Sequence, residues 1–334
     1  MDADETGAGH DSLSPLYTLA VEDGAGALLG AAAGDVAGGA HPTGYSAVTQ
    51  TATVLAYHLL RHRRVLPGLL AEELWALGGD REGRVRVYRG LSTELMGWLD
   101  SFVEGHPRPS TSPGSEAAAR VAPLGLWYRR DPEGLVSSVV SAVSVTHIGT
   151  TAVASAGAIA GAVAAASHGQ AGLDLVSGAA ETADAVMAEV ELLADLPTND
   201  DGGGGFAEQL RSSSRLVSRS PAEVVAELAP DGPSGADRAL VAVVLGAAVG
   251  DPVRAIEAGA MAGGSETGAM VGSIVGARSG LVRWPWRVPN DTWFAEIGRR
   301  LVAHHDEVRD LPVPYAVEER ATLMVPHDPS EESL

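Results

Sequence analysis

The sequence predicts an all-α protein that folds as a single compact multi-helix domain. Its 334 residues are 45% hydrophobic but only 4% aromatic, so the core is expected to consist mainly of Ala, Val and Leu. Alanine has the highest intrinsic helix propensity, and small side chains let helices approach one another closely. Apolar residues at positions 48, 52, 55, 56 and 59 also follow the period of a helix.

The expected elements follow from hydrophobic periodicity and from the breaks made by Pro and Gly. In chain order, helices are expected over residues 16–33, 46–60, 72–77 and 91–102, then, after a proline-rich loop at 106–114, from Ser115 onward with breaks at 130–132 and 147–149. Residues 84–88 alternate like a strand, but five residues cannot establish a sheet.

The domain boundaries come from the polar, acidic ends of the chain. We expect residues 1–15 to be a disordered acidic tail, 16–311 to be the all-α domain and 312–334 to be a C-terminal tail. Residues 197–205, with an Asn-Asp-Asp run and four glycines, are expected to be a flexible loop. No strand precedes them, as a phosphate-binding loop would require.

The charge balance and the missing residue types exclude several classes of function. A net charge of −20 argues against nucleic acid or an anionic membrane surface as a partner. Because the chain has no Cys, it has no disulfides, thiolate nucleophile or Cys-based zinc site. No Lys is present either, which excludes a Schiff-base or P-loop lysine. An acidic start and no apolar run of about 20 residues predict a cytoplasmic protein.

Five segments, in a fixed order, carry the main clue to family. Residues 26–35 hold an apolar helix that leads into Gly34 and Asp35, and Thr49 and Gln50 precede a second apolar helix. Residues 120–126 read Arg-Val-Ala-Pro-Leu-Gly-Leu and form the most specific segment. Thr-His at 146–147 and a glycine-rich stretch at 263–272 follow. This ordered set, covering about residues 24–300, resembles the ADP-ribosylglycohydrolase family.

The resemblance implies a single all-α domain with a cleft for ADP-ribose and two magnesium ions. Magnesium prefers oxygen ligands, usually with carboxylates among them. Where the family has Thr-Asp-Asp-Thr, residues 46–49 read Ser-Ala-Val-Thr, and where it has Gly-Gly-Asp-Thr-Asp-Thr, residues 263–267 read Gly-Gly-Ser-Glu-Thr. Only Glu266 replaces a lost acid. We therefore expect no metal site and no cofactor.

The remaining polar residues of these segments are the candidates for function. The catalytic candidates are His147, Asp35 and Glu266, and the candidate ligand-binding residues are Ser46, Thr49, Gln50, Gly114, Ser115, Arg120, Ser265 and Thr267. By resemblance, the loop at 114–115 contacts ribose and phosphates. Arg120 can pair with a phosphate or carboxylate, with a buried structural ion pair as the alternative. His147 can act as a base, with a helix N-terminus capped by Thr146 as the alternative, and turn geometry is the alternative for Asp35.

His58 and His62 are four residues apart in an expected helix, a spacing that can bind a metal ion. Arg61, Arg63 and Arg64 lie beside them, and their charge disfavours a dication. The interpretation at this stage is a cationic helix C-terminus that complements the helix dipole.

Three functional hypotheses remain. The first is a pseudoenzyme that has lost magnesium-dependent hydrolysis and binds ADP-ribose or a related small-molecule or nucleotide ligand in the cleft. The second is an enzyme that reuses the cleft for metal-independent chemistry, for instance in specialised metabolism. The third is a scaffold or interaction protein that acts through its surface.

Overall fold

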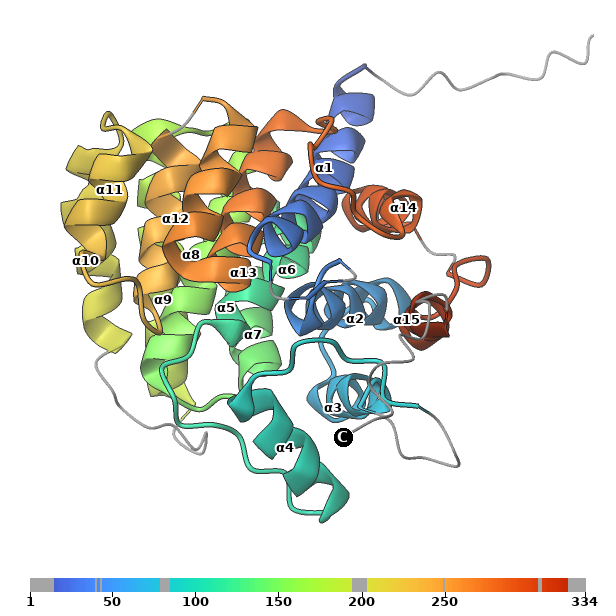
Figure 1. Cartoon of the computed structure of the whole chain (residues 1–334). Coiled ribbons are helices and arrows are strands. Elements are labelled where there is room, and N and C mark those ends of the chain that lie inside the picture. Colours follow the sequence, from blue (N-terminus) through green and yellow to red (C-terminus); the bar gives the residue numbers. More distant parts are fainter. Residues whose placement is uncertain are drawn as a thin grey trace, which may run out of the picture.

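The computed structural model describes residues 15–39, 41–42, 44–78, 85–193, 203–248, 250–305 and 308–323. Within them the chain forms fifteen α-helices and two short 3-10 turns, with no β-strand (Figure 1). The predicted all-α class is therefore confirmed. Residues 85–88 of the strand-like segment are irregular, so alternation over so short a run did not indicate a sheet.

The helices follow the expected order along the chain. They are α1 (Pro15–Ala37), α2 (Ala47–His62), α3 (Pro67–Ala76), α4 (Thr93–Val103), α5 (Glu116–Arg120), α6 (Ala122–Trp127), α7 (Pro132–Val143), α8 (Thr150–Ala166), α9 (Gly172–Leu192), α10 (Phe206–Ser213), α11 (Pro221–Leu228), α12 (Asp237–Ala248), α13 (Pro252–Ser279), α14 (Asp291–Ala303) and α15 (Pro314–Leu323). None of the helices in the described part of the chain is long and apolar enough to cross a membrane.

The centre of the fold is the antiparallel pair of α1 and α13, which come from opposite ends of the chain and lie side by side in Figure 1. Both present glycines at every fourth position, which line up along one face of a helix. The series are Gly26, Gly30, Gly34 and Gly38 on one side and Gly264, Gly268, Gly272, Gly276 and Gly280 on the other. Without side chains between them, the two backbones come into direct contact.

The closeness of this contact is shown by the backbone atoms that an added Cβ would meet at each glycine. A Cβ added at Gly30 would lie closer than 3.0 Å to the carbonyl oxygen of Gly272, and the reverse holds at Gly272. The same is true of the pair Gly34 and Gly268. Real Cβ atoms essentially never come so near to another heavy atom, so the contact requires glycine at these four positions.

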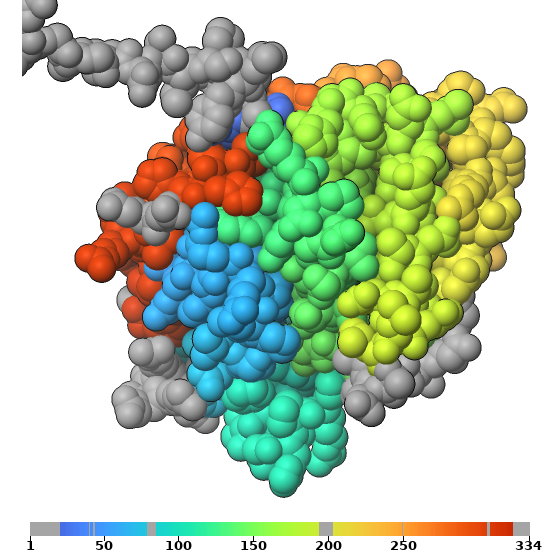
Figure 2. Space-filling model, turned by 180° about the vertical axis from the view of Figure 1, so that it is seen from behind, coloured from blue at the N-terminus to red at the C-terminus, as the bar shows by residue number. Residues whose placement is uncertain are grey.

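Around this pair, α8 forms the inner helix of one half of the fold. It packs against α5, α6, α7, α9, α12 and α13, and nearly all its residues are buried. A helix that is apolar on all sides must be enclosed by others, which explains why its sequence is almost entirely Ala, Gly and Val. In the other half, α2 packs against α3 and α15, and α4 forms the lower edge in both views (Figures 1 and 2).

The last described helix, α15, corrects the expected C-terminal tail. Residues 314–323 are helical, and Glu318 is buried, where its carboxylate accepts hydrogen bonds from Tyr45 (3.0 Å) and Gln50 (2.9 Å) and pairs with Arg89. This part of the expected tail belongs to the fold, because its buried carboxylate bonds to the chain before α2, to α2 itself and to the chain before α4. Residues 324–334, 1–14 and most of the expected 197–205 loop lie outside the described residues.

The glycine contact gives a first testable prediction. Replacing Gly30 or Gly272 by Ala forces the two helices apart, and overpacking of this kind costs about 1–3 kcal/mol, occasionally more. We expect each variant to lower the free energy of unfolding by at least that amount, measured by chemical denaturation. Gly97→Ala is the matched control, since Gly97 lies inside α4 and an added Cβ there meets nothing within 4 Å. A Gly30→Ala variant as stable as Gly97→Ala would contradict the close contact.

Candidate functional site

The glycine contact places Asp35 beside the stretch at 263–267, and the Asp35 side chain in turn bonds to residues 46–49, so the two segments with missing acids meet at Asp35. Gly34 and Asp35 lie in the last turn of α1, and the start of the second half of α13 lies opposite them. α13 is interrupted at Gly263 and Gly264, whose backbone angles are not helical; Gly264 has φ +67°, which favours glycine. Ser265 follows the break, and its hydroxyl donates a hydrogen bond to the carbonyl oxygen of Asp35 (2.9 Å).

Asp35 is fully buried and organises the start of α2. One of its carboxylate oxygens, Oδ2, accepts hydrogen bonds from the backbone N–H and the hydroxyl of Ser46 (2.9 and 3.1 Å) and of Thr49 (3.1 and 2.7 Å). Burial raises the pKa of this carboxyl, and the four hydrogen bonds oppose that shift. A carboxylate at a helix N-terminus is favourable. The turn expected at Asp35 is wrong: α1 continues through it, and the side chain caps another helix.

An open cleft lies beside this junction and consists of two adjoining cavities. The first, of about 350 Å³, is lined by residues that include Ser46, Arg120 and Ser265. The second, of about 450 Å³, is lined by residues that include Gly114 and Ser115. Glu116, Arg238 and Glu266 line both. Five of the candidate ligand-binding residues and Glu266 therefore border one cleft.

Glu266 faces the cleft in an ion pair rather than alone. Its Oε2 accepts a hydrogen bond from the guanidinium of Arg238 (2.7 Å) and another from the hydroxyl of Ser115. The Arg238 guanidinium also donates to the Ser115 hydroxyl (3.2 Å), which closes a triangle of three side chains. Glu266 is 18% exposed and Arg238 33%, so both stay in contact with the solvent in the cleft.

Glu116 adds a second carboxyl to the same wall. Burial raises its pKa to about 7, the charge of Glu266 adds to the rise, and a hydrogen bond from Ser92 and the charge of Arg120 oppose it. A carboxyl group with a pKa in this range is suited to give or take a proton near neutral pH.

Arg120 is buried at the inner wall of the first cavity. It donates to the hydroxyl of Thr146 and to the carbonyl oxygen of Ala142 (3.3 Å), while its Nε has no partner among the described residues. Burial lowers its pKa to about 10, opposed by the charge of Glu116. No carboxylate in the described part of the chain forms an ion pair with it, so the structural ion pair considered from the sequence is not observed.

His147 lies behind the cleft rather than in it. It is buried, its Nδ1 is 2.9 Å from the Thr146 hydroxyl, and it is not among the residues that line either cavity. Burial, aided by the charge of Arg120, lowers its pKa to about 3, so it is neutral. The expected helix start at His147 is also wrong, because α8 begins at Thr150 after Gly149, and Thr146 does not cap it.

Three other candidate residues, Thr49, Gln50 and Thr267, are buried near the cleft. Thr49 bonds to Asp35, and Thr267 is fully buried. Gln50 is also fully buried: it donates to the carbonyl oxygen of Val87 (2.8 Å) and to Glu318 (2.9 Å), and accepts from the N–H of Arg89 (2.9 Å). Gln50 therefore holds the chain between α3 and α4 against α2, and none of the three lines the cleft.

Sequence reasoning missed two residues of this site, Glu116 and Arg238. Glu116 directly follows the candidate Ser115, so its position next to the most specific segment was a usable signal. Arg238 lies in the first turn of α12, far from any of the five segments in sequence. Nothing in the sequence around it signals that it reaches Glu266.

Comparison with known proteins identifies the family of the chain. Residues 20–311 match the family model described as ADP-ribosylglycohydrolase. The chain belongs to this family. A search of the curated proteins gave no match.

Among solved structures, the fold of this family member resembles one titled "ADP-ribosylglycohydrolase-related protein complex". The TM-score is 0.62 at 19% sequence identity, and the match covers 86% of this chain and 99% of that one. At this identity the likeness concerns the fold, which extends over nearly the whole of the other chain.

The burial of Asp35 and its four hydrogen bonds give a second testable prediction. Asp35→Ala removes the acceptor of four hydrogen bonds and leaves two backbone N–H groups of α2 without a partner, which costs roughly 1–3 kcal/mol for each buried group. Chemical denaturation should show a larger loss than for Asp251→Ala, the matched control, since Asp251 is an exposed cap that accepts from Val253 (3.0 Å). An exposed cap contributes about 1 kcal/mol. Equal losses would mean that Asp35 does not organise this junction.

Proposed function

We propose that this protein is an ADP-ribosylglycohydrolase-family member that binds a small ligand, ADP-ribose or a related molecule, in its cleft without magnesium, and that it does not perform magnesium-dependent hydrolysis. The observation that supports this proposal is the set of mutual hydrogen bonds among Glu266, Arg238 and Ser115. The guanidinium of Arg238 donates to the carboxylate of Glu266 (2.7 Å), the one acid that stands in place of the lost acids in residues 263–267.

The residues present do not fit a pair of magnesium ions. A hard dication needs several oxygen ligands, with carboxylates to balance its charge. Asp35 is fully buried and uses one oxygen for four internal hydrogen bonds, and Glu266 already pairs with a cation. Among the described residues, no group of three His, Cys, Asp or Glu ligands within reach of one another lies in the cleft.

The cleft nonetheless has the size and polarity of a ligand site. Cavities of about 350 and 450 Å³ lie within the usual range for small-molecule sites, roughly 300–1,000 Å³. Ser46, Ser92 and Ser265 line the first cavity, so its wall is polar enough for a ribose or another polyhydroxyl group. Arg238 supplies a cation at the boundary of the two cavities, suited to a phosphate or carboxylate.

Calorimetry tests this proposal directly. We expect ADP-ribose, or a close analogue, to bind with the same affinity in magnesium and in EDTA, and ADP-ribosyl-arginine to remain intact in both. Arg238→Ala should weaken binding about tenfold or more, which corresponds to 1.4 kcal/mol. Arg215→Ala is the control, since Arg215 pairs with Glu227 on the surface and lines neither cavity. Magnesium-dependent turnover would overturn the proposal.

One observation favours metal-independent catalysis as a second candidate function. Glu116 titrates near neutrality at the wall shared by both cavities, within the field of Glu266 and of Arg120. A carboxyl group in this state can transfer a proton to or from a bound substrate. The Arg238–Glu266 pair beside it can hold developing charge in place without a metal ion.

The raised pKa of Glu116 predicts a pH dependence of stability. Its folded pKa of about 7 exceeds the ordinary value of 4.5, so the folded state binds more protons between these values, and stability falls as pH rises through this window. We expect the melting temperature to fall more from about pH 5 to about pH 8 in the wild type than in Glu116→Gln, which cannot ionise. Thermal denaturation at both pH values measures the difference. Parallel curves for the two proteins would refute the raised pKa.

A further inference from the structure

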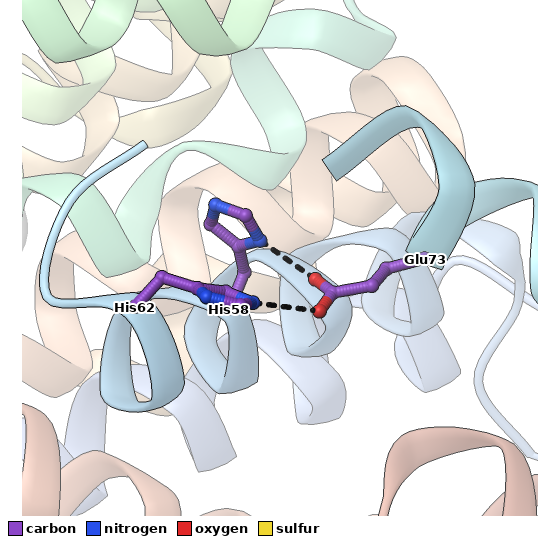
Figure 3. A group of neighbouring side chains, drawn as sticks. All are labelled: His58, His62 and Glu73. Carbon is purple, nitrogen blue, oxygen red and sulfur yellow. Dashed lines mark hydrogen bonds and ion pairs between the residues drawn. The ribbon is translucent and has the colours of Figure 1, made fainter. Parts of the chain in front are cut away.

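A cluster of three potential metal ligands lies between α2 and α3, away from the cleft. His58 and His62 stand one turn apart on α2, and Glu73 reaches them from α3 (Figure 3). His58 is twelve residues beyond Ser46, which places it about 18 Å along the helix from the start of α2. The cluster is therefore independent of the proposed ligand site and of the function proposed for it.

The carboxylate of Glu73 faces both imidazoles, with one oxygen toward each ring (Figure 3). Glu73 Oε2 is 2.7 Å from His58 Nδ1, and Oε1 is 3.2 Å from His62 Nε2. The three potential ligand atoms all lie within 4.8 Å of one another. His58 is fully buried, whereas His62 and Glu73 are 18% and 24% exposed, so the cluster has a rigid inner side and an open outer side.

Two of the arginines next to His62, Arg61 and Arg63, leave the open side of the cluster accessible. The Arg63 guanidinium turns away to the carbonyl oxygens of His304 (3.0 Å) and His305 (3.2 Å) and lies over the ring of Trp127. Arg61 is 57% exposed, and its NH1 is 4.0 Å from Glu73 Oε1. Its long side chain can move into solvent, since an exposed contact at this distance contributes little.

We propose that His58, His62 and Glu73 form a site for one divalent transition-metal ion of the zinc class. Two imidazoles at i and i+4 with a carboxylate from a facing element form a donor set that suits zinc. Magnesium and calcium prefer oxygen ligands alone, so this donor set selects against them. Three protein ligands leave a fourth, tetrahedral position for water on the exposed side.

Binding requires one local rearrangement, which the structure can accommodate. His58 Nε2 accepts a hydrogen bond from the backbone N–H of Leu66 (3.0 Å), so in the metal-free protein the ring proton is on Nδ1 and points to Glu73. A metal ion at Nδ1 moves this proton to Nε2 and displaces the Leu66 N–H. Leu66 is only partly buried, so water can replace its lost partner. Three metal–ligand bonds then stand in place of the three hydrogen bonds that the cluster makes without a metal ion.

The test is titration of the untagged full chain with Zn²⁺ by calorimetry, with Mg²⁺ as the comparison ion. We expect saturable binding of one Zn²⁺ per chain and none of Mg²⁺ at this site. His62→Ala and Glu73→Gln should each weaken Zn²⁺ binding at least about tenfold. His106→Ala is the matched control, because His106 is exposed in the loop after α4 and belongs to no such cluster.

Two results would overturn the proposal: no saturable Zn²⁺ binding up to about 0.1 mM, or unchanged binding in both ligand variants. Co²⁺ added to the wild-type protein gives a readout that does not depend on how well a variant folds. Intense visible absorption, typical of four-coordinate cobalt, is expected and should disappear on adding Zn²⁺. Weak absorption of the six-coordinate aqueous ion alone would count against the site.

Discussion

The direct contact between the backbones of α1 and α13 is the constraint on which the rest of the structure depends. Glycine at every fourth position on both helices lets them lie closer than helices separated by side chains. The contact joins the two ends of the chain, and its last step sets Asp35 against Ser265. This contact positions one part of the cleft, since the chain that follows α1 and the break in α13 line its first cavity.

Polar groups in and around the cleft are divided into two layers with different roles. The inner layer, represented by Asp35 and Gln50, is enclosed and bonds to the chain itself. Such groups stabilise one arrangement of the helices, because a buried polar group without a partner is costly. The outer layer, Glu116, Arg238 and Glu266, keeps contact with the cavity. This layer carries both signs of charge, because a guanidinium stands beside two carboxyl groups. Such a site favours a ligand that has polar groups of its own over a bare dication.

The same division explains which of the candidate residues reach the cleft. Ser46, Ser265 and Glu266 were identified from their place in recognisable segments, and the structure sets them at the cleft. Thr49 and Thr267 come from the same segments but are buried. The direction of a side chain from a helix depends on how that helix is rotated in the fold, and a motif alone does not contain this information. Glu73 was missed as a partner of His58 for a related reason, since the two meet only where α2 and α3 pack.

The sequence by itself determined the helical class, the approximate positions of the first four helices and the family. Composition and periodicity act locally along the chain, and the order of the five segments requires no geometry. Only the tertiary structure decided that α1 continues through Asp35, that α15 belongs to the fold, and that Arg238 pairs with Glu266. Each of these depends on a contact between residues far apart in sequence, where burial and charge compensation outweigh local propensity.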